Sequence, residues 1–224
     1  MDGTLQGFLA TALVTIAALV PITNPPGNAP IFLTLTAGMG EDERCAMARR
    51  IAFNCFALLV IATFVGTYIL QYFDLSLPVV RVAGGLLVAA TAWRLLNAES
   101  GDTTDAPTAT MHKSAAEVAG RAFYPLSFPL TVGPGSISIA ITLGASLPSR
   151  GVPAVSSSAG LIAGIAIVSI VIWLAYRFAT RFVRLLGATG TAVFLRLSAF
   201  ILLCIGVQIL WDGASELLAP WRAK

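Results

Sequence analysis

Long apolar stretches, separated by short polar connections, run along the whole chain. Residues 3–40 contain no Asp, Glu, Lys or Arg, and the same holds for residues 51–73 and 152–176. A helix needs about 20 apolar residues to cross the hydrocarbon core of a bilayer. The pattern therefore predicts an all-α membrane protein. Six transmembrane helices are expected, at residues 5–38, 51–73, 79–96, 122–147, 152–176 and 190–211.

The first of these segments contains a stretch that cannot continue an α-helix. Residues 20–30 hold four prolines, one glycine and two asparagines. Because proline lacks the amide donor and clashes with the preceding turn, the segment is predicted to form two helical pieces, residues 5–20 and 28–38. In hydrocarbon, a break is tolerated only where its backbone groups face protein, water or a ligand. The break is therefore a candidate binding site.

The fourth segment repeats this design, since the order Pro-x-Thr-x-x-Pro-Gly occurs in both. At the same spacing, the identical residues are Pro21 and Pro129, Thr23 and Thr131, Pro26 and Pro134, Gly27 and Gly135, Thr34 and Thr142, and Leu35 and Leu143. We interpret the match as an internal duplication. Three crossings per half would make the two three-helix repeats inverted, with helices 1 and 4 broken at their Pro/Gly motifs. The alternative is that Pro- and Gly-rich loops look alike by chance.

Composition supports a membrane protein and excludes several other classes. The chain is 57% hydrophobic and 11% charged, whereas soluble domains carry roughly 25% charged residues. The net charge of +3 does not indicate nucleic-acid binding, because the basic residues lie between apolar segments. The three cysteines of the chain lack the spacing of a metal site or a disulfide framework. The sequence shows neither a catalytic nucleophile paired with a general base nor a phosphate-binding loop. We therefore expect that the protein is not an enzyme and binds no cofactor or metal.

The connections suggest how the chain is divided and oriented. A long polar stretch predicts a linker at residues 98–119 between a first repeat, residues 1–97, and a second, residues 120–224. With six crossings, nine basic residues fall on one face and three on the other, which predicts that both termini lie outside the cytoplasm. Re-entrant broken segments would give four crossings and the same count. We favour six, because a cluster of three arginines after residue 176 is unlikely to be exported.

The two breaks offer groups that suit a small polar ligand. Helix N-termini at Asn28 and Ser136 would present unpaired amides and the positive end of a helix dipole, which favour an anionic group. Hydroxyl and amide side chains add hydrogen-bonding groups, and glycines leave room at the backbone. No Asp or Glu lies inside a span, so carbonyls freed at the breaks are the expected ligands of any coupling cation. The candidate substrate-binding residues of the breaks are Thr23, Asn24, Pro26, Gly27, Asn28, Thr131, Gly133, Pro134, Gly135 and Ser136.

Two arginines inside the apolar zone complete the candidate site. Arg81 and Arg196 each lie a few residues into the third segment of their half. Because an arginine in hydrocarbon is costly, it usually faces the bundle interior or reaches a partner. Either residue could bind a substrate carboxylate or fix carbonyls of the broken segments; the alternative is that they snorkel to the headgroups. For Arg196, flanked by Leu195 and Leu197, we expect a buried role.

Several of these motifs resemble the MarC family of bacterial and archaeal membrane proteins. Residues 24–32, Asn-Pro-Pro-Gly-Asn-Ala-Pro-Ile-Phe, are similar to its Asp-Pro-x-Gly-Asn-x-Pro signature, and residues 128–137 to its Pro-Leu-x-x-Gly-Pro-Gly-x-Ile. Residues 81–86 and 206–213 also look like its third and sixth segments. The resemblance implies six helices in the bacterial inner membrane, kinship with LysE-type exporters and transport of small neutral amino acids. Asn24 stands where many members have Asp, which removes a possible cation ligand.

The resulting hypothesis is a transporter of small neutral amino acids such as glycine or alanine. The substrate would bind between the broken helices near the midplane, with sodium or a proton as the coupling cation. The further partners of this hypothesis are the lipid bilayer and a second copy of the chain. A non-transporting membrane scaffold or sensor is the alternative. A drug or metabolite exporter is less favoured, because the residues near the breaks are small. Substrate, direction, coupling ion and oligomeric state stay open.

Overall fold

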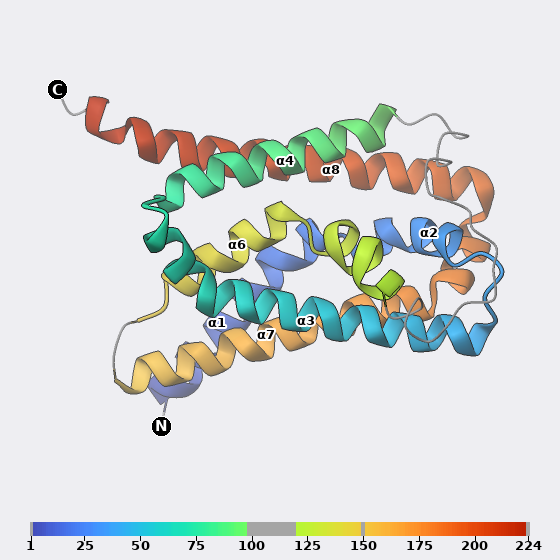
Figure 1. Cartoon of the computed structure of the whole chain (residues 1–224), viewed down its shortest axis with the longest axis horizontal. Helices are drawn as coiled ribbons and strands as arrows, with labels where there is room; N and C mark the ends of the chain where they lie inside the picture. Colours follow the sequence, from blue (N-terminus) through green and yellow to red (C-terminus); the bar gives the residue numbers. More distant parts are fainter. Residues whose placement is uncertain (1, 98–119, 149–150, 223–224) are drawn as a thin grey trace.

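The computed structural model describes residues 2–97, 120–148 and 151–222, and this part of the chain folds entirely into helices and their connections. The predicted linker at residues 98–119 lies outside the described residues. Figure 1 shows the helices running roughly along one long axis, with both termini at the same end. In chain order the elements are α1 (Asp2–Thr23), α2 (Pro25–Leu35), α3 (Glu41–Tyr72), α4 (Leu77–Asn97), the π-helical η1 (Ala122–Thr131), α6 (Pro134–Ala145), α7 (Val152–Arg177) and α8 (Ala179–Arg222).

The predicted all-α membrane fold is confirmed. Five described helices, α1, α3, α4, α7 and α8, are long and apolar enough to cross a bilayer, and η1 with α6 makes a sixth if this pair, bent by 71°, is one span. In Figure 1, η1 lies on the side of the molecule where α4 ends, and α6 continues towards the end where α7 begins. A pair bent in this way is either one broken span or a re-entrant segment, so the sixth crossing stays a prediction.

Two helices begin earlier than the apolar pattern predicts. The second was expected from residue 51, yet α3 begins at Glu41, where three acidic residues occupy its first turn and the Gly40 amide donates to Glu43 Oε2 at 3.1 Å. Acidic groups stabilise a helix N-terminus, so this helix extends beyond its apolar part. The sixth was expected from residue 190, but α8 begins at Ala179 and is interrupted only at Gly187.

Close helix contacts hold the bundle together. The α4–α8 contact depends on Gly85 and Gly206: a Cβ on Gly85 would lie 2.4 Å from the Leu210 backbone nitrogen, and one on Gly206 would lie 2.5 Å from that of Ala89. Similarly, a Cβ on Gly160 of α7 would lie 2.3 Å from the Phe8 carbonyl oxygen of α1. Small residues allow helix backbones to approach this closely in membranes.

The broken segments lie inside the bundle. On one side, α6 packs between α3 and α4; on the other, α2 packs against α7 and α8. Reciprocal contacts of this kind are what an inverted repeat requires, although the repeat itself stays a prediction. The main core surrounds α2 and η1 and includes the fully buried Leu19, Phe32, Ile51 and Leu161. Large apolar residues such as Phe53 are exposed on the outside, as contact with lipid requires.

Candidate functional site

The two breaks meet inside the protein through the side chain of Asn28. Its Nδ2 donates to the Thr23 carbonyl oxygen at 2.9 Å and to the Leu130 carbonyl oxygen at 3.2 Å. Thr23 is the last residue of α1 and Leu130 lies near the end of η1. Asn28 is only 7% exposed, so one buried amide connects segments that are far apart in sequence. In Figure 1 both junctions lie in the middle part of the long axis, away from either end.

The first break is narrower than predicted. Helix α1 continues through Pro21 to Thr23, and α2 begins at Pro25 instead of Asn28. Only Asn24 interrupts the helices, with φ 39° and ψ 57° in the left-handed region. Asparagine tolerates that conformation better than most residues, and prolines are well accommodated in a first helical turn, where no amide donor is needed. The predicted boundaries at residues 20 and 28 are therefore wrong.

This geometry leaves little at the start of α2 for a ligand. Pro25 and Pro26 have no N–H, the Gly27 amide donates to Asn24 Oδ1 at 3.2 Å, and the Asn28 amide donates to the Asn24 carbonyl oxygen at 3.0 Å. A Cβ on Gly27 would lie 2.2 Å from Asn24 Nδ2, so this glycine makes room for the cap rather than for a substrate. The expectation of free amides at this helix end is wrong.

The second break differs from the first. Helix η1 ends at Thr131, Val132 and Gly133 are extended, and α6 begins at Pro134, two positions before the expected start at Ser136. Gly133 has no side chain with which to cap the helix. Within the described chain, no acceptor is bonded to the amides of Gly135 and Ser136 or to the Ser136 hydroxyl, although Ser136 is only 2% exposed. The start of α6 therefore retains free donors in a buried position.

The α4 helix covers one side of this second break. A Cβ on Gly135 would lie 2.0 Å from Val88 Cγ2, and one on Gly84 would lie 2.6 Å from Ser138 Cβ. The Ser138 hydroxyl also donates to the Val80 carbonyl oxygen at 3.0 Å. The first turns of α6 are thus held firmly against α4, which keeps the free donors at the start of α6 in a fixed position.

The other predicted hydroxyls are already hydrogen-bonded. Thr23 Oγ1 donates to the Leu19 carbonyl oxygen at 2.9 Å, and Thr131 Oγ1 donates to the Leu126 carbonyl oxygen at 2.6 Å. Both side chains are almost completely buried. Each therefore satisfies the backbone beside a break, and Ser136 alone among the predicted hydroxyls is free within the described residues.

A buried aromatic residue that sequence reasoning missed adjoins the breaks. The Tyr176 hydroxyl lies 2.7 Å from Thr131 Oγ1; because the single Thr131 hydroxyl hydrogen is used by Leu126, Tyr176 is the donor. Its ring stacks on Phe32 of α2, with centroids 4.7 Å apart and planes 3° apart. Tyr176 is 2% exposed and Phe32 fully buried. In the sequence, a tyrosine at the end of an apolar segment suggests only an interfacial residue.

The surroundings of Cys55 are more polar than those of an ordinary packing residue. It is fully buried on α3 and lies beside the hydroxyls of Ser127 and Thr131. Ser127 Oγ donates to the Ala122 carbonyl oxygen at 2.6 Å. Together with Tyr176 and Asn28, these side chains form a buried polar cluster between α2, α3, η1 and α7. No group of three or more His, Cys, Asp or Glu in the described chain could hold a metal ion.

Neither predicted arginine contacts the breaks. Arg81 forms an ion pair with Glu216 of α8, so its guanidinium is paired with a carboxylate of this chain. Arg196, expected to be buried, is exposed, and it forms no hydrogen bond or ion pair with any described residue. Its position on the outer face of α8 corresponds to the snorkelling alternative, because helical side chains lean towards the helix N-terminus and a long stem can carry the charge to the headgroups.

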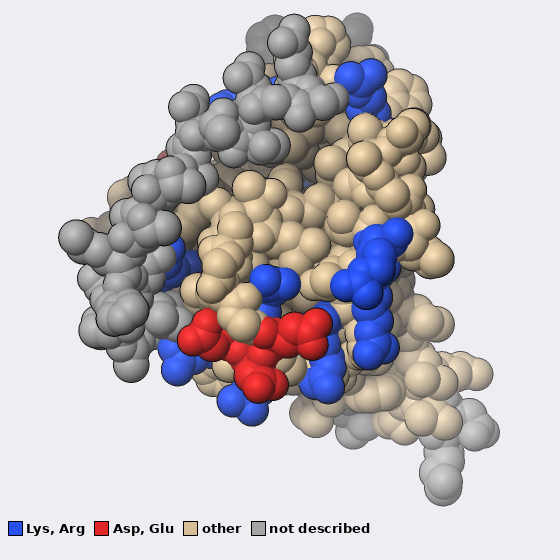
Figure 2. All heavy atoms as spheres, turned by 90° about the vertical axis from the view of Figure 1, so that its right-hand side faces the viewer, with Lys and Arg blue, Asp and Glu red and all other residues tan. Residues whose placement is uncertain are grey.

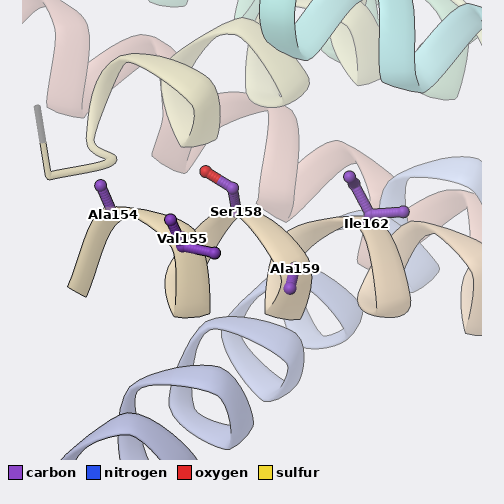
Figure 3. Close-up of a pocket in the computed structure, with 5 residues that line it drawn as sticks. All are labelled: Ala154, Val155, Ser158, Ala159 and Ile162. Atoms are coloured by element: carbon purple, nitrogen blue, oxygen red, sulfur yellow. The ribbon is translucent and has the colours of Figure 1, made fainter. Parts of the chain in front are cut away.

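A hollow of about 420 Å³ lies elsewhere, along the first turns of α7 (Figure 3). It is open and almost entirely apolar, and Val155 beside it is 73% exposed. Its surface therefore faces the surroundings of the helix bundle and offers few groups to a polar ligand. Its lining residues are Ala154, Val155, Ser158, Ala159 and Ile162.

Comparisons with known proteins agree with the motifs. Residues 9–218 match the sequence profile described as "MarC family integral membrane protein". Proteins of Escherichia coli K12 and Shigella flexneri, both named "UPF0056 inner membrane protein MarC", are each 29% identical to this chain over 92% of its length and 95% of theirs. No solved structure matches the chain.

Proposed function

The chain belongs to the MarC family of integral membrane proteins, and from this premise we propose that it transports small neutral amino acids, without converting them chemically. The substrate would bind at the second break, with its carboxylate at the start of α6. The observation that carries the proposal is the buried set of free donors there: the amides of Gly135 and Ser136 and the Ser136 hydroxyl. Helix N-termini with unpaired amides are ready-made sites for anionic groups.

The remaining groups at this break suit a small zwitterion. The carbonyl oxygens of Thr131 and Val132 accept no hydrogen bond from described residues and could receive an ammonium group. No charged side chain belongs to either break, so a substrate without net charge needs no further counterion. Since Gly135 packs against Val88 and Gly84, little room is left for a large side chain, which favours glycine and alanine.

Uptake of labelled glycine or alanine into proteoliposomes tests the proposal, with a sodium gradient, a proton gradient or neither. Ser136→Ala removes a hydroxyl that makes no hydrogen bond to a described residue, so we expect KM to rise by about tenfold to 150-fold, the range for a hydrogen bond to a charged group. Ser146→Ala, at the exposed opposite end of α6, is the matched control and should transport normally. No uptake or exchange across a broad amino-acid panel would contradict the proposal.

A non-transporting scaffold or sensor is the second candidate. It is favoured by the fully capped start of α2 and by the Asn28 bonds that join the breaks, since both features serve the fold without any ligand. On that hypothesis, Ser136→Ala changes neither transport nor ligand binding. Binding calorimetry of the purified protein with glycine and alanine separates the two candidates. Only a transporter should give a heat of amino-acid binding, and Ser136→Ala should reduce that heat.

A further inference from the structure

Three arginines lie where α7 passes into α8. We call Arg177, Arg181 and Arg184 the arginine trio; all three are exposed. Helix α7 ends at Arg177, Phe178 separates it from α8, and α8 is interrupted at Gly187, whose φ of 65° and ψ of −178° suit only glycine. Residues 179–186 therefore form a short helix of their own between two bends. In Figure 1 this bend lies at the end of the molecule opposite the termini.

The trio is supported by aromatic rings instead of carboxylates. The Arg177 guanidinium lies 5.1 Å from the centre of the Trp173 ring, and Arg181 lies 5.5 Å from that of Phe178. Within the described chain the single ion pair is Arg81–Glu216, so no described acidic residue forms an ion pair with the trio. Figure 2 shows this end of the molecule, with several basic side chains around one small acidic group. Glu41, Asp42 and Glu43, which start α3, form no ion pair with the trio.

The short helix also has the two faces of an interfacial helix. On its inner side Ala179 is fully buried and Phe182 packs edge-to-face on Phe194, with centroids 5.1 Å apart. On its outer side Leu185 is 87% exposed next to Arg184 and Arg181. An exposed leucine beside exposed arginines is typical of helices that place apolar side chains at the acyl boundary and basic ones at the headgroups.

We propose that the arginine trio binds the phosphodiester of an anionic phospholipid, such as phosphatidylglycerol. Guanidinium groups pair with phosphate oxygens through two parallel hydrogen bonds, and stacking on Trp173 and Phe178 orients two of the three planar groups in advance. The inference is independent of the proposed transport function, because it involves no residue of either break.

Native mass spectrometry of the full-length protein tests the proposal, with phosphatidylglycerol, phosphatidylcholine and inorganic phosphate added in separate titrations. We expect phosphatidylglycerol to bind the wild-type protein in preference to phosphatidylcholine. The triple variant Arg177→Gln, Arg181→Gln, Arg184→Gln should lose this preference. Each basic residue near an anionic headgroup contributes about fivefold in affinity, so the loss should be on the order of a hundredfold. Inorganic phosphate alone should not compete at millimolar concentration.

The chain offers a matched control at the same end of the molecule. Arg49→Gln, Arg50→Gln, Arg94→Gln removes the same charge from three other exposed arginines and should change the affinity by less than about threefold, which is one basic residue's share or less. Replacing the trio by lysines keeps its charge but not the paired hydrogen bonds or the ring stacking, so the lysine variant should bind phosphatidylglycerol less tightly than the wild type and more tightly than the glutamine triple. An unfolding temperature of the glutamine triple equal to that of the wild type shows that its loss of binding is not misfolding. Equal binding of both lipids, competition by phosphate, or equal losses in the two glutamine triples would overturn the proposal.

Discussion

Asn28 is the residue on which the junction of the two breaks depends. Asn28→Leu keeps the shape of the side chain but leaves the carbonyl oxygens of Thr23 and Leu130 without their donor. A stranded buried polar group costs about 1–3 kcal/mol, so we expect a clear fall in the unfolding temperature of the purified protein. Asn54→Leu, on a partly exposed side chain of α3 without an internal bond, is the control. If the two variants unfold alike, Asn28 does not hold the breaks together.

Tyr176 and Phe32 form a buried aromatic stack beside the breaks. Tyr176→Phe keeps the ring stack and leaves Thr131 bonded to Leu126, so its cost should be only about 0.5–1.5 kcal/mol. Tyr176→Ala also removes the ring and leaves a cavity, which costs about 3–5 kcal/mol. Unfolding by denaturant measures both changes. A loss as large for Tyr176→Phe as for Tyr176→Ala would show that the hydroxyl matters more than the ring.

The reactivity of the Cys55 thiol gives a second measure of the cavity that Tyr176→Ala is expected to leave. The thiol is fully buried beside Ser127 and Thr131, so in a protein lacking Cys45 and Cys204 its alkylation by N-ethylmaleimide should be slow. We expect Tyr176→Ala to accelerate the reaction at least about tenfold, because cavities admit small reagents where a packed interior does not. Alkylation as fast in the wild type as in Tyr176→Ala would mean that the Tyr176 ring does not shield the Cys55 thiol.

For single residues, the sequence allows prediction of chemical type but not of orientation. The free Ser136 hydroxyl and the joining role of Asn28 involve residues that the Pro/Gly motifs already point to. The prediction that Arg196 is buried is wrong because its leucine neighbours do not indicate which side of α8 faces the bundle. The exposed side depends on how α8 is rotated against α4. Tyr176 escapes prediction because its partner, Thr131, is brought to it only by the tertiary fold.

At the scale of elements, the contact between α4 and α8 is the clearest test of close packing. Gly206→Ala places a Cβ 2.5 Å from the Ala89 backbone nitrogen, where no flexible side chain can move aside. The helices must separate, and overpacking of this kind costs about 1–3 kcal/mol. Gly40→Ala, with nothing within 4 Å of the added atom, should unfold within about 0.5 kcal/mol of the wild type. Equal stability of the two variants would contradict the tight contact.

The boundaries of the elements show where apolar patterns stop being informative. The five described helices that are long and apolar enough to cross a bilayer lie where the apolar pattern places their central parts, because hydrocarbon admits only hydrogen-bonded backbone. Helix ends are not, since α3 continues through the charged residues from Glu41 and α1 continues through Pro21. Polar residues form helices equally well outside the bilayer, and a single proline in a membrane helix can be accommodated by its neighbours. Neither the extension of α3 nor that of α1 changes the hydrophobic pattern of the sequence, so this pattern cannot predict them.

At the scale of the whole molecule, the two ends of the bundle differ in charge. The start of α3 and the junction of α7 with α8 lie together, as the bonds of Arg44 to Thr180 and of Arg177 to Cys45 show. Both regions are rich in arginine, with Arg44, Arg49 and Arg50 in the first and the arginine trio in the second. The turn between α3 and α4 and both termini lie at the opposite end (Figure 1). The basic residues counted in the connections therefore lie together at one end of the molecule, as the predicted membrane orientation requires. One pair of reporter fusions is enough to test this orientation.

Positively charged connections are retained in the cytoplasm during insertion, so we predict that both termini are periplasmic. Alkaline phosphatase, which is active only after export, should be active when fused after Lys224 and inactive when fused within residues 98–119. Green fluorescent protein at the same two sites should give the opposite pattern. Because the prediction depends on the arginine-rich end, replacing Arg44, Arg49, Arg50 and the arginine trio by glutamine should yield a mixed population in both assays. An active phosphatase within residues 98–119 of the unmodified chain would reverse the assigned orientation.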